Sequence, residues 1–285
     1  MTPSRKLALL LVALASGATA AAWQPDDNLS ASSQAVAKAR AERIEKDLAR
    51  LKGHPWAGAY YWGVGMGANV SFLIAPKSGF VFYLRGCLGL YDLNYGSVGG
   101  TSQRLRLLFE QPNRSAGFGG FDPELTPVVW GHRHYLIPSD KMLDFVNEVN
   151  AGLEPRKTTE GVFLLREGDE RKAVRGDPGV PSDYRSYVLA APITLGILFV
   201  GKSRPEKSYG CKSMGRVTPV TLDAGSAKGV KVGMEFYVFA PLPIFESARV
   251  TKVQGGVSEA EVVQCAEDTP PSTEWKLSTR AMRGQ

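Results

Sequence analysis

The stretch NVSFLIAPKSGFVFYLR, residues 69–85, contains two apolar runs on either side of the turn-forming segment Pro76 to Gly79. Apolar side chains that recur with a period of two are typical of β-strands, so we expect strands over 69–75 and 79–85. The same period and the same density of turn residues continue on both sides of this stretch. The further strands that they predict are 58–64, 88–93, 103–110, 128–137 and 161–166.

Together these strands predict a mainly β fold of barrel or sandwich modules, in which helices are a minor part. The strands are short and follow one another at about ten residues, which favours antiparallel pairing over a parallel sheet with crossover helices. Residues 54–175 are expected to form an N-terminal β-rich domain. A helix over 139–151, with Ser139 as its cap, should close one side of that domain. Residues 176–205 would follow as a linker and a buried strand.

A second group of short strands predicts a small C-terminal β-barrel over residues 206–285. Its expected strands are 214–222, 234–240, 246–254, 257–264 and 274–280. The segment Val220 to Phe239 contains the pattern L-D-x-G-S-x-x-G-V-x-x-G-M-x-F-x-V, in which glycines permit tight turns.

Residues 206–280 resemble the small C-terminal β-barrel of flagellar assembly protein T and of similar bacterial envelope proteins. The part of the chain around Tyr60–Gly63 is similar to secreted bacterial proteins without an assigned function. The resemblance implies a fold and an envelope setting, and it brings no catalytic residues.

The composition indicates a globular chain of one or two domains. Of its 285 residues, 22% are charged and 44% are hydrophobic, with 31 Gly and 18 Pro. These values exclude a collagen, a coiled coil, a disordered tail and a polytopic membrane protein. The net charge of +6 is too small an excess for a nucleic-acid-binding surface, so no nucleic acid partner is expected.

Residues 1–22 have the features of a secretory signal peptide. Two basic residues precede an apolar run over 7–15, and small residues then lead to cleavage after Ala20 or Ala22. The run is shorter than the roughly 20 residues of a spanning helix, so no transmembrane segment is expected after cleavage. The Ala-rich signal is typical of a Gram-negative bacterium and predicts a periplasmic or secreted protein.

Residues 23–53 are expected to form a polar lead and one amphipathic helix, capped by Ser32 or Ser33. Its apolar stripe consists of Val36, Ala39, Ile44, Leu48 and Leu51. Basic residues outnumber acidic ones on this helix, which would suit a membrane surface or a partner. The favoured interpretation is a helix packed on the following domain, because no bulky aromatic residue lies on its apolar side.

The three cysteines predict one disulfide in an oxidising compartment. Cys211 and Cys265 both belong to the C-terminal module, whereas Cys87 lies in an apolar stretch that is typical of a buried thiol. We therefore predict the pair Cys211–Cys265 over the two pairs that include Cys87. Three free buried thiols are the alternative.

Five residues are candidates for a binding surface. Aromatic residues cluster at Tyr60, Trp62 and Trp130, and one set of them could form an exposed stacking surface while the other lies in the core. His132 and His134 would share one face of a strand, and a third metal ligand could come from His54, Asp122 or Asp140. Two histidines on a strand are more often not metal ligands, so no metal site is predicted.

The segment Gly196–Ser203 matches the phosphate-loop pattern G-x-x-x-x-G-K-[ST], and we reject that interpretation. The four residues between its glycines are bulky and β-forming, and Pro205 follows at once, so no helix can open at Lys202. A strand that ends in a turn is expected instead.

These observations favour a periplasmic or secreted envelope protein that is a binding or structural module for a protein or cell-wall glycan partner. No catalytic residue and no cofactor are predicted, since no nucleophile elbow is present. The alternative is a secreted hydrolase that uses His132 or His134 with a carboxylate, with or without a metal ion. The sequence leaves the ligand and the oligomeric state open.

Overall fold

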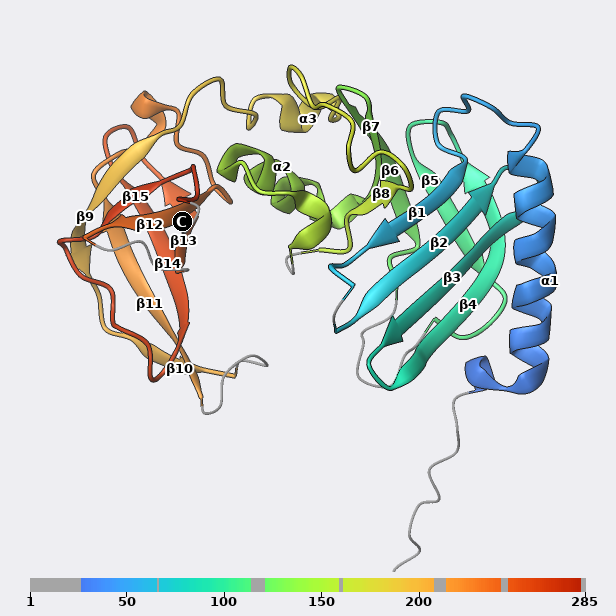
Figure 1. Cartoon of the computed structure of the whole chain (residues 1–285). Coiled ribbons are helices and arrows are strands. Elements are labelled where there is room, and N and C mark those ends of the chain that lie inside the picture. Colours follow the sequence, from blue (N-terminus) through green and yellow to red (C-terminus); the bar gives the residue numbers. More distant parts are fainter. Residues whose placement is uncertain are drawn as a thin grey trace, which may run out of the picture.

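The computed structural model describes residues 27–65, 67–113, 121–158, 161–207, 214–241 and 246–282. Within them the chain folds into two β-barrels, with two longer helices packed against the first (Figure 1). The predicted fold class, mainly β with an N-terminal helix and one inserted helix, is confirmed. In the described part of the chain, no helix is long and apolar enough to cross a membrane.

The first barrel consists of eight strands that pair in the order of the sequence. They are β1 (Gly58–Trp62), β2 (Asn69–Ala75), β3 (Gly79–Gly86), β4 (Gly89–Gly100), β5 (Leu105–Phe109), β6 (Glu124–Trp130), β7 (Arg133–Pro138) and β8 (Leu164–Arg166). Each strand is antiparallel to the next, and β8 closes the barrel by pairing Arg166 with Tyr60 of β1. Closure leaves this sheet without exposed edges.

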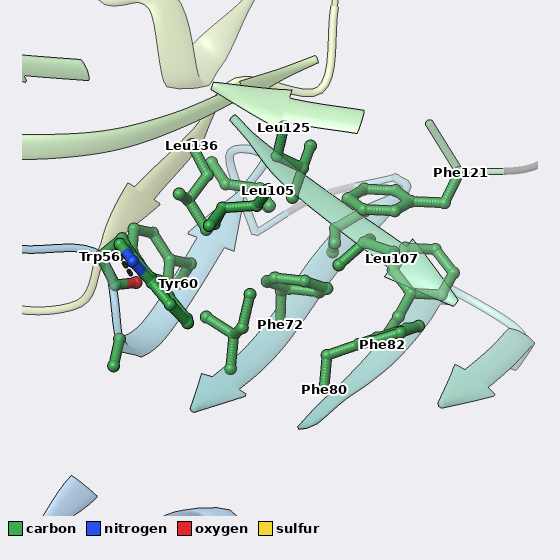
Figure 2. Close-up of a cluster of buried hydrophobic side chains, with 14 of the residues drawn as sticks. Trp56, Tyr60, Phe72, Phe80, Phe82, Leu105, Leu107, Phe121, Leu125 and Leu136 are labelled. Atoms are coloured by element: carbon green, nitrogen blue, oxygen red, sulfur yellow. Dashed lines mark hydrogen bonds between the residues drawn. The ribbon is translucent and has the colours of Figure 1, made fainter. Parts of the chain in front are cut away.

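Large apolar side chains fill the interior of the first barrel. Tyr60, Phe72 and Phe82 are neighbours across β1, β2 and β3, and all three are buried. The ring of Phe121, from the segment before β6, lies 5.4 Å from that of Phe72 and 4.7 Å from that of Phe82 between centroids (Figure 2). An eight-stranded barrel is just wide enough for side chains to fill it. Its centre is therefore a packed core.

Helix α1 (Ala31–Leu48) covers the outer face of β2, β3 and β4 (Figure 1). Its fully buried residues Ala37 and Ile44 pack in one cluster with Val81 and Leu93 of the barrel. The helix therefore packs on the barrel, as the favoured interpretation required. The predicted stripe is wrong at Val36 and Ala39, which are exposed, because the face that meets the barrel passes through Ala37 instead. The helix begins earlier than expected, because the side chain of Ser30 is the cap that accepts the Ser33 N–H.

Helix α2 (Met142–Ala151) covers the outer face of β7 and β8 and begins in a 3-10 turn over Ser139–Lys141. The Phe145 ring packs edge-on against those of Tyr135 and Phe163, at centroid distances of 5.4 and 5.6 Å. The predicted helix over 139–151 thus lies where it was expected, on one side of the barrel. The predicted cap is wrong, because Ser139 lies inside the 3-10 turn and Lys141, at the N-cap of α2, makes no side-chain cap hydrogen bond.

The second barrel is formed by the later strands. They are β9 (Thr194–Val200), β10 (Arg204–Glu206), β11 (Gly215–Leu222), β12 (Glu235–Ala240), β13 (Ser247–Val253), β14 (Ser258–Cys265) and β15 (Lys276–Ser278). The pairing of β9 with β11 closes the ring, and β10 adds to the free end of β11. The barrel includes β9, so it begins before residue 206. No helix opens after Gly201-Lys202-Ser203, as the rejection of a phosphate loop required.

Helix α2 also contacts the second barrel. The Asn147 side chain donates a 3.0 Å hydrogen bond to the Gly233 carbonyl, and Arg249 forms a 2.6 Å ion pair with Asp144. Gly233 has a φ of +84°, and a Cβ there would lie 2.4 Å from the Leu143 side chain. The positive φ favours glycine at this position. The connection between the barrels, from the end of β8 to the start of β9, contains the short helix α3 (Ser182–Arg185).

The predicted strand over 128–137 is wrong, because these residues form the β6–β7 hairpin. Gly131 and His132 make the turn between Trp130 and Arg133. Gly131 has a φ of +60°, and a Cβ there would lie 2.7 Å from the Ala173 carbonyl oxygen. A side chain would therefore be strained in the turn and would clash with the loop that packs over it.

Candidate functional site

Two of the predicted aromatic binding residues belong to the inside of the first barrel. Tyr60 is only 1% exposed, and its hydroxyl donates a 2.8 Å hydrogen bond to the Trp56 carbonyl. Trp62 shares its face, is half-buried, and donates from Nε1 to the Thr158 carbonyl at 3.2 Å. Tyr60 is therefore a core residue, and the two do not form an exposed stacking surface.

The other predicted binding residues lie apart from these. Trp130, at the end of β6, donates from Nε1 to the Gly176 carbonyl at 2.9 Å. His132 is exposed in the turn, so it does not share a strand face with His134 as predicted. In the part of the chain that the structure describes, no group of three or more His, Cys, Asp or Glu residues is placed to hold a metal ion.

His134 is held by a buried carboxylate. One oxygen of Asp169 lies 2.8 Å from His134 Nδ1 and also accepts the His134 backbone N–H at 2.8 Å, while Lys172 pairs with the other oxygen. Burial would raise the pKa of the Asp169 carboxyl, but hydrogen bonds from Lys172 and His134 outweigh burial and lower it. This arrangement fixes the imidazole.

One of the predictions for the cysteines is wrong. Cys87 is a free, exposed thiol in the turn between β3 and β4, so the expectation of a buried thiol is wrong. The apolar residues around it belong to a hairpin tip. Cys211 lies outside the described residues, so its pairing with Cys265 stays a prediction.

A cavity of the first barrel lies where β6 begins, β7 ends and β8 begins. It has a volume of about 800 Å³. Its lining is Arg104, Asn113, Phe121, Asp122, Pro123, Glu124, Pro138, Ser139, Asp140, Lys141, Gly161 and Val162. This volume is in the range of cavities that bind small molecules or parts of larger ligands.

Two carboxyl groups meet in this cavity. Asp122 accepts the Glu124 backbone N–H at 2.7 Å, and its side chain is hydrogen-bonded to that of Asp140. Burial raises the pKa of Asp122 to about 6, and the hydrogen bond and charge of Asp140 act in the same direction. The Asp122 carboxyl is thus protonated more readily than an ordinary aspartate.

Charges of both signs line the rest of the cavity. Arg104 donates from Nε to Glu124 at 2.8 Å, and Lys141 lies 3.4 Å from Asp144 of α2. These cations are therefore held at the rim by carboxylates that lie beside the Asp122–Asp140 pair.

Phe121 separates the cavity from the barrel core. Its ring is 4% exposed and points toward Phe72 and Phe82 (Figure 2). The Asn113 side chain accepts the Phe121 N–H at 3.0 Å and donates to the Phe121 carbonyl at 2.6 Å. The backbone next to Asp122 is therefore fixed on both sides.

Sequence reasoning named Asp122 and Asp140 only as possible partners of the histidines. The structure brings the two together, 18 residues apart in the chain, and places neither histidine in this cavity. Arg104, Phe121 and Lys141 were missed, because no local pattern links residues before β5, before β6 and after β7.

No family model, curated protein or solved structure matches this chain.

Proposed function

We propose that this chain is a non-enzymatic binding protein of the bacterial envelope, which takes part of a cell-wall or protein partner into the cavity of its first barrel. The observation that carries this proposal is the Asp122–Asp140 pair, held in a cavity of about 800 Å³ on a closed barrel. The signal pattern of residues 1–22 and the resemblance to envelope proteins support the setting.

The lining indicates the chemistry of the ligand. The half-buried carboxyl group of Asp122 is stabilised by hydroxyl, amide or ammonium donors, because polar groups removed from water need hydrogen-bond partners. Arg104 and Lys141 add donors at the rim. Glycan hydroxyls and the amides of a cell-wall peptide offer these groups.

A binding role fits the histidines better than hydrolysis does. A hydrolase that used His134 would need its imidazole beside a bond of the bound substrate, yet that imidazole does not line the cavity. His132 is an exposed turn residue. We therefore do not propose the hydrolase.

Soluble cell-wall fragments test the proposal. Titration of 15N-labelled residues 23–285 with purified peptidoglycan fragments is expected to shift the amide signals of residues that line the cavity. The variant Asp122→Asn/Asp140→Asn should weaken binding at least about tenfold, which corresponds to about 1.4 kcal/mol. Asp177→Asn, at an exposed loop carboxylate, is the matched control.

Two results would contradict the proposal. Shifts confined to residues outside the cavity would show that the ligand binds elsewhere. Equal affinity of the double variant and the wild-type protein, with both folded, would remove the carboxyl pair from the binding site. If cell-wall fragments fail to bind, a periplasmic extract is passed over the immobilised wild-type protein and the double variant. Proteins retained only by the wild type would support a protein partner, and retention of the same proteins by both would reject it.

A further inference from the structure

A second cavity, of about 540 Å³, is lined by two arginines and two glutamates. Arg166 ends β8, Glu167 and Glu170 follow it, and Arg156 comes from the turn before β8. Tyr61 of β1 also lines the cavity. The cavity shares no residue with the one that contains Asp122 and Asp140.

Both guanidinium groups are held by main-chain carbonyls. Arg166 donates from Nη2 to the carbonyls of His54 and Pro55, both at 3.0 Å, and to the Tyr60 hydroxyl at 3.1 Å. Arg156 donates from Nη1 to the Gly63 carbonyl at 2.8 Å and lies 5.5 Å from the centre of the Tyr61 ring. Both charges are therefore fixed in position.

Neither arginine has a carboxylate partner within the described residues. An ion pair would place a nitrogen within 4.0 Å of a carboxylate oxygen, and none is formed by Arg156 or Arg166. Arg156 Nη2 and Arg166 Nη1 donate to no described residue. Half-buried charges are usually paired, so these two are poised to bind an anionic group.

The two glutamates of this cavity are negative charges without a cationic partner among the described residues. Glu167 and Glu170 line the same cavity, and their carboxylates form no ion pair with a described residue. Burial raises the pKa of Glu167, and the negative charge of Glu170 raises it further. A cation between the two carboxylates would relieve this repulsion.

We propose that this cavity binds a small zwitterion, a molecule with one carboxylate and one ammonium group, such as a free dipeptide. Arg156 and Arg166 bind the carboxylate, for which a planar guanidinium is well suited. Glu167 and Glu170 bind the ammonium group. The two sets of charges form no ion pair with each other, and the cavity of about 540 Å³ that they line leaves room for a small ligand. A simple anion fits less well, since the glutamates repel it.

Calorimetric titration of the full chain with four ligands, the last of them inorganic phosphate, tests the proposal. The zwitterion alanyl-alanine is expected to bind. Its N-acetyl form lacks the ammonium group and its C-terminal amide lacks the carboxylate, so each should bind at least tenfold more weakly. Three results would overturn the proposal: no saturable binding of alanyl-alanine at about 10 mM, equal binding of the acetylated form, or tighter binding of inorganic phosphate.

Variants assign the charges. Arg156→Gln should weaken alanyl-alanine and its N-acetyl form alike, whereas Glu167→Gln should weaken only the free dipeptide. Lys157→Gln, next to Arg156 and exposed, should change neither. If Arg156→Gln fails to fold, Glu167→Gln still decides, because a merely structural glutamate would not distinguish a free amine from an acetylated one. Equal affinity of Glu167→Gln for the free dipeptide would refute the assignment.

Discussion

The carboxyl pair of the first cavity should make the stability of the protein depend on pH. The pKa of Asp122 is raised from 3.8 to about 6. Its carboxyl group is therefore protonated more readily in the folded than in the unfolded chain. Protonation stabilises the fold fully below about pH 3.8, and this contribution is lost as the pH rises through 6.

The variant Asp122→Asn should not lose stability as the pH rises, because it has no carboxyl group to ionise at this position. An asparagine can still accept the Glu124 N–H and can donate to Asp140, so the hydrogen bonds remain while the charge disappears. The pKa change from 3.8 to about 6 corresponds to about 3 kcal/mol. Asp122 is only half-buried, so solvent screening lowers the expected gain to about 1–2 kcal/mol at pH 8.

Urea denaturation between pH 3.5 and 8 measures this effect. The free energies of unfolding of the variant and the wild type should agree near pH 3.5, diverge between about pH 4 and 6, and stay apart by a constant amount above pH 7. Asp177→Asn should follow the wild type throughout. A constant difference at every pH would refute the reasoning, because it would show that the charge of Asp122 is not the cause.

Three further changes test the packing. Phe121→Ala should lower the free energy of unfolding by about 3–4 kcal/mol in urea, because the ring fills the core beside Phe72 and Phe82; a loss below about 1 kcal/mol would contradict this packing. Arg249→Met should lower the free energy of unfolding by about 2–3 kcal/mol, because Asp144 and Glu235 lose the cation that they share. A triple variant in which both of these carboxylates are also replaced should recover most of the lost stability. Cys211→Ser should lower the midpoint of thermal unfolding if the predicted disulfide forms; three reactive thiols in the unfolded, unreduced wild type would exclude that disulfide.

The strands could be predicted because their signal is local. Along β2, buried and half-buried residues alternate, so burial on one face leaves a period of two in the sequence. The first four residues of β3 are all buried, because α1 covers the outer face of that strand. The β6–β7 hairpin was missed because no local signal marks its turn. Apolar residues continue on both sides of Gly131 and His132, and the strain that requires glycine there comes from the loop at Ala173, which is 42 residues away.

The candidate site could be predicted only as separate residues. Asp122 and Asp140 look like surface charges in the sequence, and the raised pKa of Asp122 arises because the fold half-buries its carboxyl group beside that of Asp140. A chain of contacts extends from there: Lys141 lines the same cavity and lies 3.4 Å from Asp144 of α2, which pairs at 2.6 Å with Arg249 of the second barrel.

Each member of that chain is an ordinary charged residue in its own element. The charges become one network because α2 packs on both barrels, through the Phe145 ring on one side and the Asn147–Gly233 hydrogen bond on the other. Helix periodicity predicts the apolar face of α2, whereas nothing local in the sequence marks the residues that face a second module. Sites built from such contacts can therefore be recognised only once the packing of the elements is known.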